Sequence, residues 1–149
     1  MKNAILKKVI VLHGPNLNLL GNRENDIYGN ITLDQINDKL KNLGNGLGIE
    51  VITRQSNYEG MLIEWIQNAK KEGIHGIIIN PAAYTHTSIA IRDALLSTDL
   101  PVIEVHLSNI FTRESFRHQS FISGVVKGQI TGLGLNSYLL ALRAFAEEF

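Results

Sequence analysis

Short runs rich in Val and Ile alternate along this chain with segments of helical periodicity, and this alternation limits the fold more than any other feature. Such alternation is typical of βαβ units built around a mostly parallel sheet. Three of the runs are almost continuously apolar, as is usual for strands that are buried on both faces of the sheet. We predict five strands, at residues 9–12, 50–55, 76–80, 102–106 and 124–131.

Capping residues indicate where helices begin. Thr32 with Gln35, and Ser56 with Glu59, have the spacing of a capping box, in which each of the two side chains bonds to the other residue's backbone. An amphipathic segment follows each pair. We predict helices from these points towards residues 43 and 71, a third after Ser88 and a last at about 136–148.

Five strands with intervening helices indicate an α/β, flavodoxin-like three-layer sandwich with a five-stranded parallel sheet. A chain of 149 residues has the size of one domain and can bury a substantial core. We therefore expect one domain over residues 1–149.

The charge balance argues against a nucleic-acid partner. Lys and Arg total 14, Asp and Glu total 14, and no basic stripe is interleaved with aromatic residues. No stretch approaches the roughly 20 apolar residues that cross a bilayer, and the absence of Cys excludes disulfides and thiolate chemistry. We expect a cytoplasmic protein that binds neither nucleic acid nor membrane.

Polar residues collect where predicted strands end. Asn16 lies just beyond the first strand, Asn80 ends the third, and 104–108 covers the end of the fourth. In open parallel sheets, ligands bind beyond the carboxyl ends of the strands, near a reversal of strand order. The sequence therefore places the candidate site at this edge.

Glu104 and His106 lie two residues apart on a strand, so their side chains share one face of the sheet. The carboxylate could hold the imidazole and favour its protonated form, which would make the pair a general acid. A metal site and a purely structural polar pair are the alternatives. Metal is less favoured, because no further Cys or His cluster has the customary spacing.

The connection at 13–31 is unusually long and rich in Asn and Gly, and it carries Arg23 and Tyr28. Long loops in compact domains are often functional lids. Arg23 could stabilise a Tyr28 phenolate only if the loop excludes water, because exposed ion pairs contribute only about 0–1 kcal/mol. The alternative is a solvated loop with a turn at Tyr28 and Gly29.

Other polar residues have two interpretations each. His86 precedes a predicted helix and could bind an anion or hydroxyl, or cap the helix. Arg113 and Arg117 could bind a carboxylate or form a solvated basic face. His13 and His75, at strand boundaries, are interpreted as structural.

Taken together, the polar segments are similar to those of the type II 3-dehydroquinate dehydratases. Several motifs in the right order make the resemblance far more specific than one short pattern would be. It spans essentially the whole chain. The motifs are HGPNLNLLG at 13–21, IYG at 27–29, INPAAYTHTS at 79–88, IRDAL at 91–95, IEVHLSN at 103–109 and FRHQS at 116–120.

This resemblance implies a hydro-lyase of the shikimate pathway, in aromatic amino acid biosynthesis. The implied reaction converts 3-dehydroquinate to 3-dehydroshikimate by anti (trans) elimination of water through an enolate. It requires neither metal nor organic cofactor. The resemblance further implies one catalytic domain at 1–149 with a lid at about 20–29, and a homododecamer built as a tetramer of trimers.

The resemblance also assigns catalytic roles. Tyr28 matches the base that removes the C2 proton, and Arg23 the cation that favours its phenolate. His106, oriented by Glu104, matches the acid that protonates the leaving hydroxyl. Asn16 matches the residue at the enolate oxygen.

Further positions match substrate-binding residues of the family. Three bind ring hydroxyls, two hold the carboxylate through their main chain, one reaches a neighbouring subunit's site and one is a candidate lid cation. The binders of ring hydroxyls are Asn80, His86 and Arg117, and the main-chain binders of the carboxylate are Leu107 and Ser108. Asp93 matches the residue that reaches a neighbouring subunit's site, and Arg113 is the candidate lid cation.

Two positions depart from the usual pattern. Asn25 stands where a proline often follows the lid glutamate, and Gln119 stands where a histidine is frequent. The departure at Asn25 bears on the stiffness of the lid, and the departure at Gln119 bears on the hydrogen bonding near Arg117.

The alternative function is a non-catalytic small-anion binding module of the same fold. Such a module could lose Tyr28 or Arg23, yet both are present.

Overall fold

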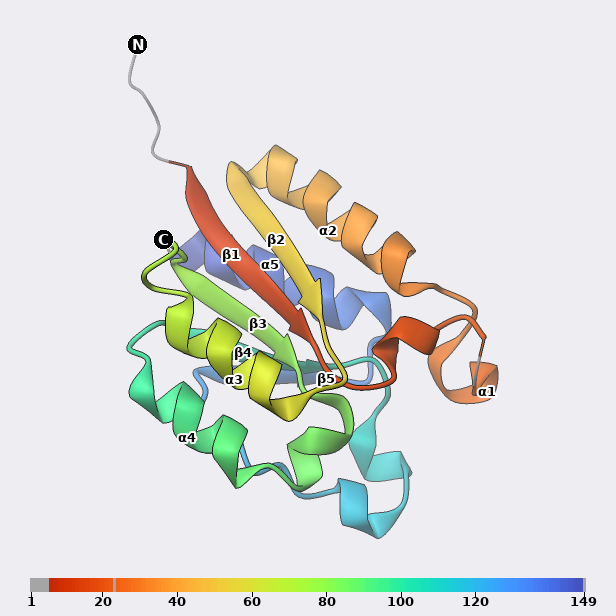
Figure 1. Ribbon diagram of the computed structural model, residues 1–149. Coiled ribbons are helices and arrows are strands. Elements are labelled where there is room, and N and C mark those ends of the chain that lie inside the picture. The colour runs from red at the N-terminus through yellow and green to blue at the C-terminus, as the bar shows by residue number, and fades with distance from the viewer. Residues whose placement is uncertain (1–5, 23, 149) are drawn as a thin grey trace.

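Five parallel strands form the middle layer of the computed structural model, which describes residues 6–22 and 24–148 (Figure 1). The sheet order is β2-β1-β3-β4-β5, so strand order reverses between β1 and its neighbour β3. The predicted flavodoxin-like α/β fold is confirmed. The strands are β1 (Lys7–His13), β2 (Ile49–Gln55), β3 (Gly76–Asn80), β4 (Val102–His106) and β5 (Gly128–Thr131).

Helices cover both faces of the sheet, as Figure 1 shows. α2 (Leu33–Leu47) and α5 (Leu135–Glu148) lie on one face, and α3 (Glu59–Asn68) and α4 (Ile89–Ser97) lie on the other. The remaining helices are short: η1 (Leu17–Leu19), α1 (Asn25–Tyr28), η2 (Ala82–His86), η3 (Ile110–Thr112) and η4 (Ser115–Arg117).

Successive side chains of each central strand point to opposite faces of the sheet, which divides the core into two layers. On β1, Val9 and Val11 pack in the α2 and α5 layer, while Ile10 and Leu12 pack in the α3 and α4 layer. All four side chains are fully buried. Burial of each such side chain contributes about 1.5–3 kcal/mol, which explains why the strand is apolar at every position between 9 and 12.

One of the two predicted capping boxes is present. Thr32 Oγ1 accepts the Gln35 N–H at 3.2 Å, and Gln35 Oε1 accepts the Thr32 N–H at 3.0 Å. The Ser56 and Glu59 prediction was wrong, because the buried Ser56 instead accepts the N–H of Tyr58 at 2.9 Å. This turn delays α3, which begins at Glu59 with Tyr58 as its N-cap.

The start of one strand and the form of one connection differ from prediction. Residues 124–127 are turn and bend rather than strand, since the Val125 N–H bonds to the Ile122 carbonyl and pairing with β4 begins at Gly128. The connection at 13–31 is not an open loop either, because it contains η1 and α1.

Two glycines of α2 offer a matched test of packing. A Cβ on Gly44 would lie 2.6 Å from the Ile49 carbonyl oxygen, whereas a Cβ on Gly46 meets nothing within 4 Å. We expect Gly44→Ala to lower the free energy of unfolding by about 1–3 kcal/mol. We expect Gly46→Ala to raise it by about 0.5–1 kcal/mol, because alanine favours helix. Urea denaturation of both variants measures this, and equal effects would contradict the close approach of α2 to β2.

Candidate active site

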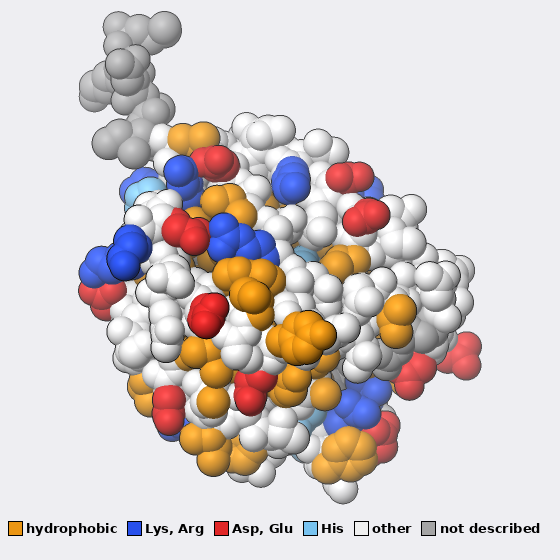
Figure 2. Space-filling view, viewed as in Figure 1, with side chains coloured by type: hydrophobic (Ala, Val, Ile, Leu, Met, Phe, Trp, Pro, Cys, Tyr) orange, Lys and Arg blue, Asp and Glu red, His pale blue; other side chains and the backbone are white. Residues whose placement is uncertain are grey.

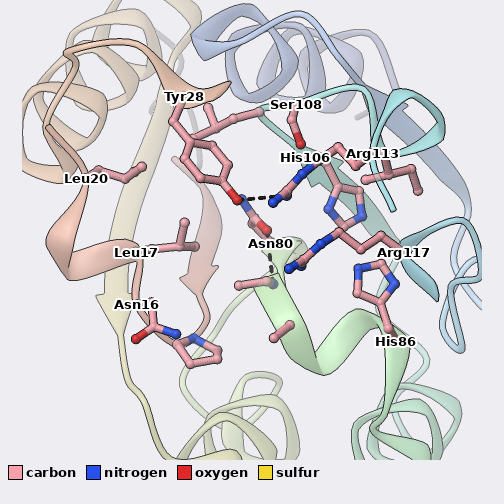
Figure 3. Close-up of a pocket in the computed structure, with 15 residues that line it drawn as sticks. Asn16, Leu17, Leu20, Tyr28, Asn80, His86, His106, Ser108, Arg113 and Arg117 are labelled. Atoms are coloured by element: carbon pink, nitrogen blue, oxygen red, sulfur yellow. Dashed lines mark hydrogen bonds between the residues drawn. The ribbon is translucent and has the colours of Figure 1, made fainter. Parts of the chain in front are cut away.

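A pocket opens at the carboxyl ends of β1, β3 and β4, beside the reversal of strand order (Figure 3). Its walls come from the segment after β1, from α1, from the turn after β3 and from the segment after β4. Nine predicted site residues line it: Asn16, Tyr28, Asn80, His86, His106, Leu107, Ser108, Arg113 and Arg117.

Tyr28 is paired with Arg113 across the pocket. Arg113 Nη1 donates a hydrogen bond to the Tyr28 hydroxyl at 2.8 Å, and the guanidinium carbon lies 5.3 Å from the Tyr28 ring centre. The buried Nε of Arg113 has no hydrogen-bond partner among the described residues. The predicted cation Arg23 lies outside the described residues. The positively charged guanidinium of Arg113 therefore faces the phenol oxygen of Tyr28, where it would stabilise a phenolate.

Glu104 and His106 form the predicted pair. Nε2 of His106 bonds to Oε2 of Glu104 at 2.5 Å, and both side chains are buried. Ser120 Oγ lies 2.9 and 3.1 Å from the two Glu104 oxygens and donates to this carboxylate. The carboxylate is thus held on two sides. Ser120 was not predicted, although it ends the FRHQS motif.

His86 and Arg117 lie at the far side of the pocket from Tyr28 (Figure 3). Nδ1–H of His86 donates to the Gln119 carbonyl at 2.8 Å, and burial lowers the pKa of His86. A neutral His86 keeps Nε2 as an acceptor for a hydroxyl. Ser88, not His86, caps α4 by accepting the Ile91 N–H. Arg117 Nε pairs with Glu114 at 2.7 Å.

Asn16 lies in the segment after β1 and has an unusual backbone conformation. Its backbone is left-handed, with φ 68°, and its N–H donates to Asn57 Oδ1 at 2.9 Å. Gln55 donates to the same oxygen at 3.1 Å. The end of β2 therefore shapes the segment that carries Asn16.

Asp93 is separate from the pocket. It is exposed on α4 and does not line the cavity. Its predicted role concerns the site of a neighbouring subunit.

A buried polar network lies under Asn80. Asn80 Nδ2 donates to the Tyr138 hydroxyl at 3.0 Å, which lies 3.0 Å from His13 Nδ1, and His13 Nε2 bonds to Asn37 Oδ1 at 2.8 Å. His13 and Tyr138 are fully buried. Burial lowers the pKa of His13 to about 4 and raises that of Tyr138. His75 accepts the Lys8 N–H at 3.0 Å, which agrees with the structural role predicted for it.

His13 should make stability depend on pH. As pH falls below 6.5 the unfolded chain gains a proton at His13, while the folded protein does not until about pH 4. The free energy of unfolding should therefore fall by up to about 3 kcal/mol across this window and lose no more from this group below it. Urea titrations from pH 7 to 4 measure the fall. His13→Asn should show a shallower dependence, and an unchanged slope would contradict a neutral buried His13.

Residues 6–22 and 24–148 contain neither a metal-binding cluster of side chains nor a membrane-spanning helix. No group of three or more His, Cys, Asp or Glu side chains there is arranged to hold a metal ion. In the same part of the chain, no helix is both long and apolar enough to cross a membrane.

Comparison with known proteins places the chain in a family. A sequence model described as Dehydroquinase class II matches residues 7–146. The chain belongs to the class II dehydroquinases. The resemblance that the motifs indicated is thus confirmed across nearly the whole length.

Three named relatives are each similar to this chain over nearly the whole length of both proteins. The 3-dehydroquinate dehydratase of Bordetella avium is 56% identical over 137 residues, covering 92% of this chain and 95% of its own. That of Geotalea daltonii is 59% identical over 138 residues, covering 92% and 94%. The crystal structure of a type II dehydroquinase from Propionibacterium acnes has a TM-score of 0.91 at 47% identity, covering 95% and 97%.

Proposed function

We propose that this protein is a 3-dehydroquinate dehydratase, a hydro-lyase that converts 3-dehydroquinate to 3-dehydroshikimate by anti (trans) elimination of water through an enolate. The relatives carry the name of this activity at 56–59% identity. The observation that supports the mechanism best is the presence of two separate proton-transfer candidates in one pocket. They are the Tyr28–Arg113 pair and the His106–Glu104 pair.

Tyr28 is the proposed base. A proton next to a ketone is weakly acidic, so its removal needs a strong base and a means of stabilising the charge that develops. Tyrosine is ordinarily a weak acid that must first lose its own proton. Arg113 at 2.8 Å stabilises the phenolate, and by family resemblance Arg23 adds a second positive charge.

His106 is the proposed acid. Hydroxide is a poor leaving group, so a proton must reach the C1 oxygen as the carbon–oxygen bond breaks. The fully buried Glu104 carboxylate orients the imidazole and stabilises its protonated form. Ser120 holds that carboxylate in turn.

The other polar groups bind and orient substrate in this proposal. Asn16 serves the enolate oxygen, and the main chain of Leu107 and Ser108 serves the carboxylate. The ring hydroxyls are left to Asn80, His86 and Arg117. All of these residues line the pocket, so each has access to a bound ring.

The wider organisation is also proposed. Residues 1–149 form one catalytic domain whose segment at about 20–29 closes over substrate. It acts in the cytoplasm, in the shikimate pathway of aromatic amino acid biosynthesis.

The proposed assembly is a homododecamer, a tetramer of trimers in which Asp93 reaches a neighbouring site. Exposed apolar side chains such as Met61, Ile89 and Leu96 on α3 and α4 support assembly, because oligomers cover such surface. Figure 2 shows hydrophobic side chains over these helices among charged ones. Light scattering should give about twelve times the 16.5 kDa chain mass, and a monomer would contradict it.

The activity is tested by ultraviolet absorbance of 3-dehydroquinate mixed with purified protein, since the product is a conjugated enone. The assay is repeated with a metal chelator, and again with protein that was first treated with borohydride in the presence of substrate, which reduces and so traps any imine between a lysine and the substrate ketone. Rising absorbance under all conditions is expected. Loss with chelator would indicate a metal, and loss with borohydride an imine. No turnover by folded protein would favour the small-anion binding module.

A further inference from the structure

The buried pair His13 and Tyr138 has no part in the proposed chemistry, although it adjoins the pocket. His13 ends β1 and Tyr138 belongs to α5, and they meet beneath Asn80 at the end of β3. Both side chains are 0% exposed. Burying polar side chains is costly unless each is hydrogen-bonded, and an apolar pair could fill the same space without that requirement.

The hydrogen positions follow from groups that can only donate or only accept. The Ala82 N–H lies 3.1 Å from the Asn80 side chain and can only donate, so the oxygen of that amide faces Ala82. The amide nitrogen therefore donates to Tyr138, at 3.0 Å. Figure 3 marks the bond from Asn80 to the backbone and shows the amide within the pocket.

The chain of hydrogen bonds continues from Tyr138 away from the pocket. Since the Tyr138 oxygen accepts from Asn80, its own hydrogen is available to His13 Nδ1, 3.0 Å away. A bare Nδ1 leaves the hydrogen of the neutral ring on Nε2, which donates to Asn37 Oδ1 at 2.8 Å. The bonds thus run in one direction, from Asn80 through Tyr138 and His13 to Asn37 on α2.

We propose that Tyr138 and His13 are positioning residues for substrate binding, which lock the Asn80 amide so that its second N–H faces the pocket as a donor. An amide nitrogen carries two hydrogens, and Tyr138 accepts one of them. The group served is an uncharged oxygen of the substrate, such as a ring hydroxyl. The proposal relies on the proposed function only for the identity of that substrate.

A second structural feature depends on the same lock. Ala82 has φ 53°, a left-handed conformation that costs free energy for a residue with a Cβ. Its N–H is bound by the Asn80 oxygen, and a 2.8 Å bond from the Gly14 N–H to the Asn80 carbonyl ties the segment to the end of β1. An Asn80 side chain free to rotate would release this segment, which forms part of the pocket wall.

The kinetic test is Tyr138→Phe, which removes only the hydroxyl. Asn80 contacts substrate in both the ground and transition states in this proposal, so KM should rise about tenfold while kcat changes by less than about threefold. Phe145→Leu is the control, because Phe145 is buried on the same helix but does not line the pocket. It should lower thermal stability and leave KM within about twofold. An unchanged KM in Tyr138→Phe would overturn the proposal.

A double-mutant cycle separates positioning from a general structural effect. If Tyr138 acts through Asn80, adding Tyr138→Phe to Asn80→Ala should change kcat/KM by less than about twofold. Effects that multiply would refute the coupling. His13→Asn places an oxygen acceptor near the position of Nδ1 and should retain kcat/KM, whereas His13→Leu should reproduce the defect of Tyr138→Phe.

A third measurement does not depend on activity. Neutron diffraction from crystals at neutral pH locates the hydrogens directly. We expect hydrogen on His13 Nε2 and on the Tyr138 oxygen towards His13. Hydrogen on Nδ1 would overturn the directional chain even if the enzyme is active. Wild-type protein without dehydratase activity but with the expected hydrogens would contradict the proposed function and leave the lock of Asn80 in place.

Discussion

Replacing Tyr28 by Phe is expected to lower kcat for 3-dehydroquinate by about 10²–10⁴-fold, the range that general base catalysis usually contributes. The change removes only the oxygen to which Arg113 donates at 2.8 Å. Phenylalanine keeps the ring beneath the guanidinium, so the pocket wall should remain. The enone absorbance assay at saturating substrate measures kcat, and binding of product should persist.

Tyr58→Phe is the matched control for this prediction. It is the same chemical change at a side chain that is 76% exposed and does not line the pocket. It should leave kcat unchanged. Near-normal turnover by Tyr28→Phe would rule out the tyrosine as the base and would direct attention to another group in the pocket.

Glu104→Gln is expected to lower kcat by about 10²-fold or more, because it removes the negative charge that stabilises protonated His106. Glutamine matches glutamate in size, so the fully buried site should stay filled. The amide oxygen of glutamine can still accept from both Ser120 and His106, as Oε2 of Glu104 does, so the substitution removes the charge and keeps these bonds. Steady-state kinetics with denaturation curves distinguish loss of turnover from loss of fold.

Glu72→Gln is the matched control, since Glu72 is paired with Arg54 at 2.9 Å on the exposed surface. An exposed ion pair contributes about 0–1 kcal/mol, so both stability and kcat should change little. Full activity of Glu104→Gln would show that His106 does not need the carboxylate, and the assignment of the acid would have to change.

Much of the fold could be predicted because its signals are local. The β1 run is apolar at each position from 9 to 12, since both faces of a central parallel strand are buried. The Thr32 and Gln35 pair predicted a helix start correctly because a capping box involves only four consecutive residues. The same spacing misled at Ser56, because its side chain accepts the Tyr58 N–H and so forms a turn before the helix.

The candidate site was predictable in part, for a different reason. Glu104 and His106 could be paired from sequence because strand geometry alone sets residues two apart on one face. The match of the motifs to a known family supplied the substrate and the residue roles. Neither periodicity nor spacing could have supplied them.

The sequence by itself therefore determined the order of strands and helices, the buried strands and the polar edge where chemistry was expected. Only the tertiary structure decided which side chains meet there: Arg113 with Tyr28, separated by 85 residues, and Tyr138 with His13, separated by 125. Contacts between such distant residues leave no periodic pattern, because each depends on the packing of whole elements. The physical reason is that backbone preferences act over a few residues, while a site forms where the folded elements converge.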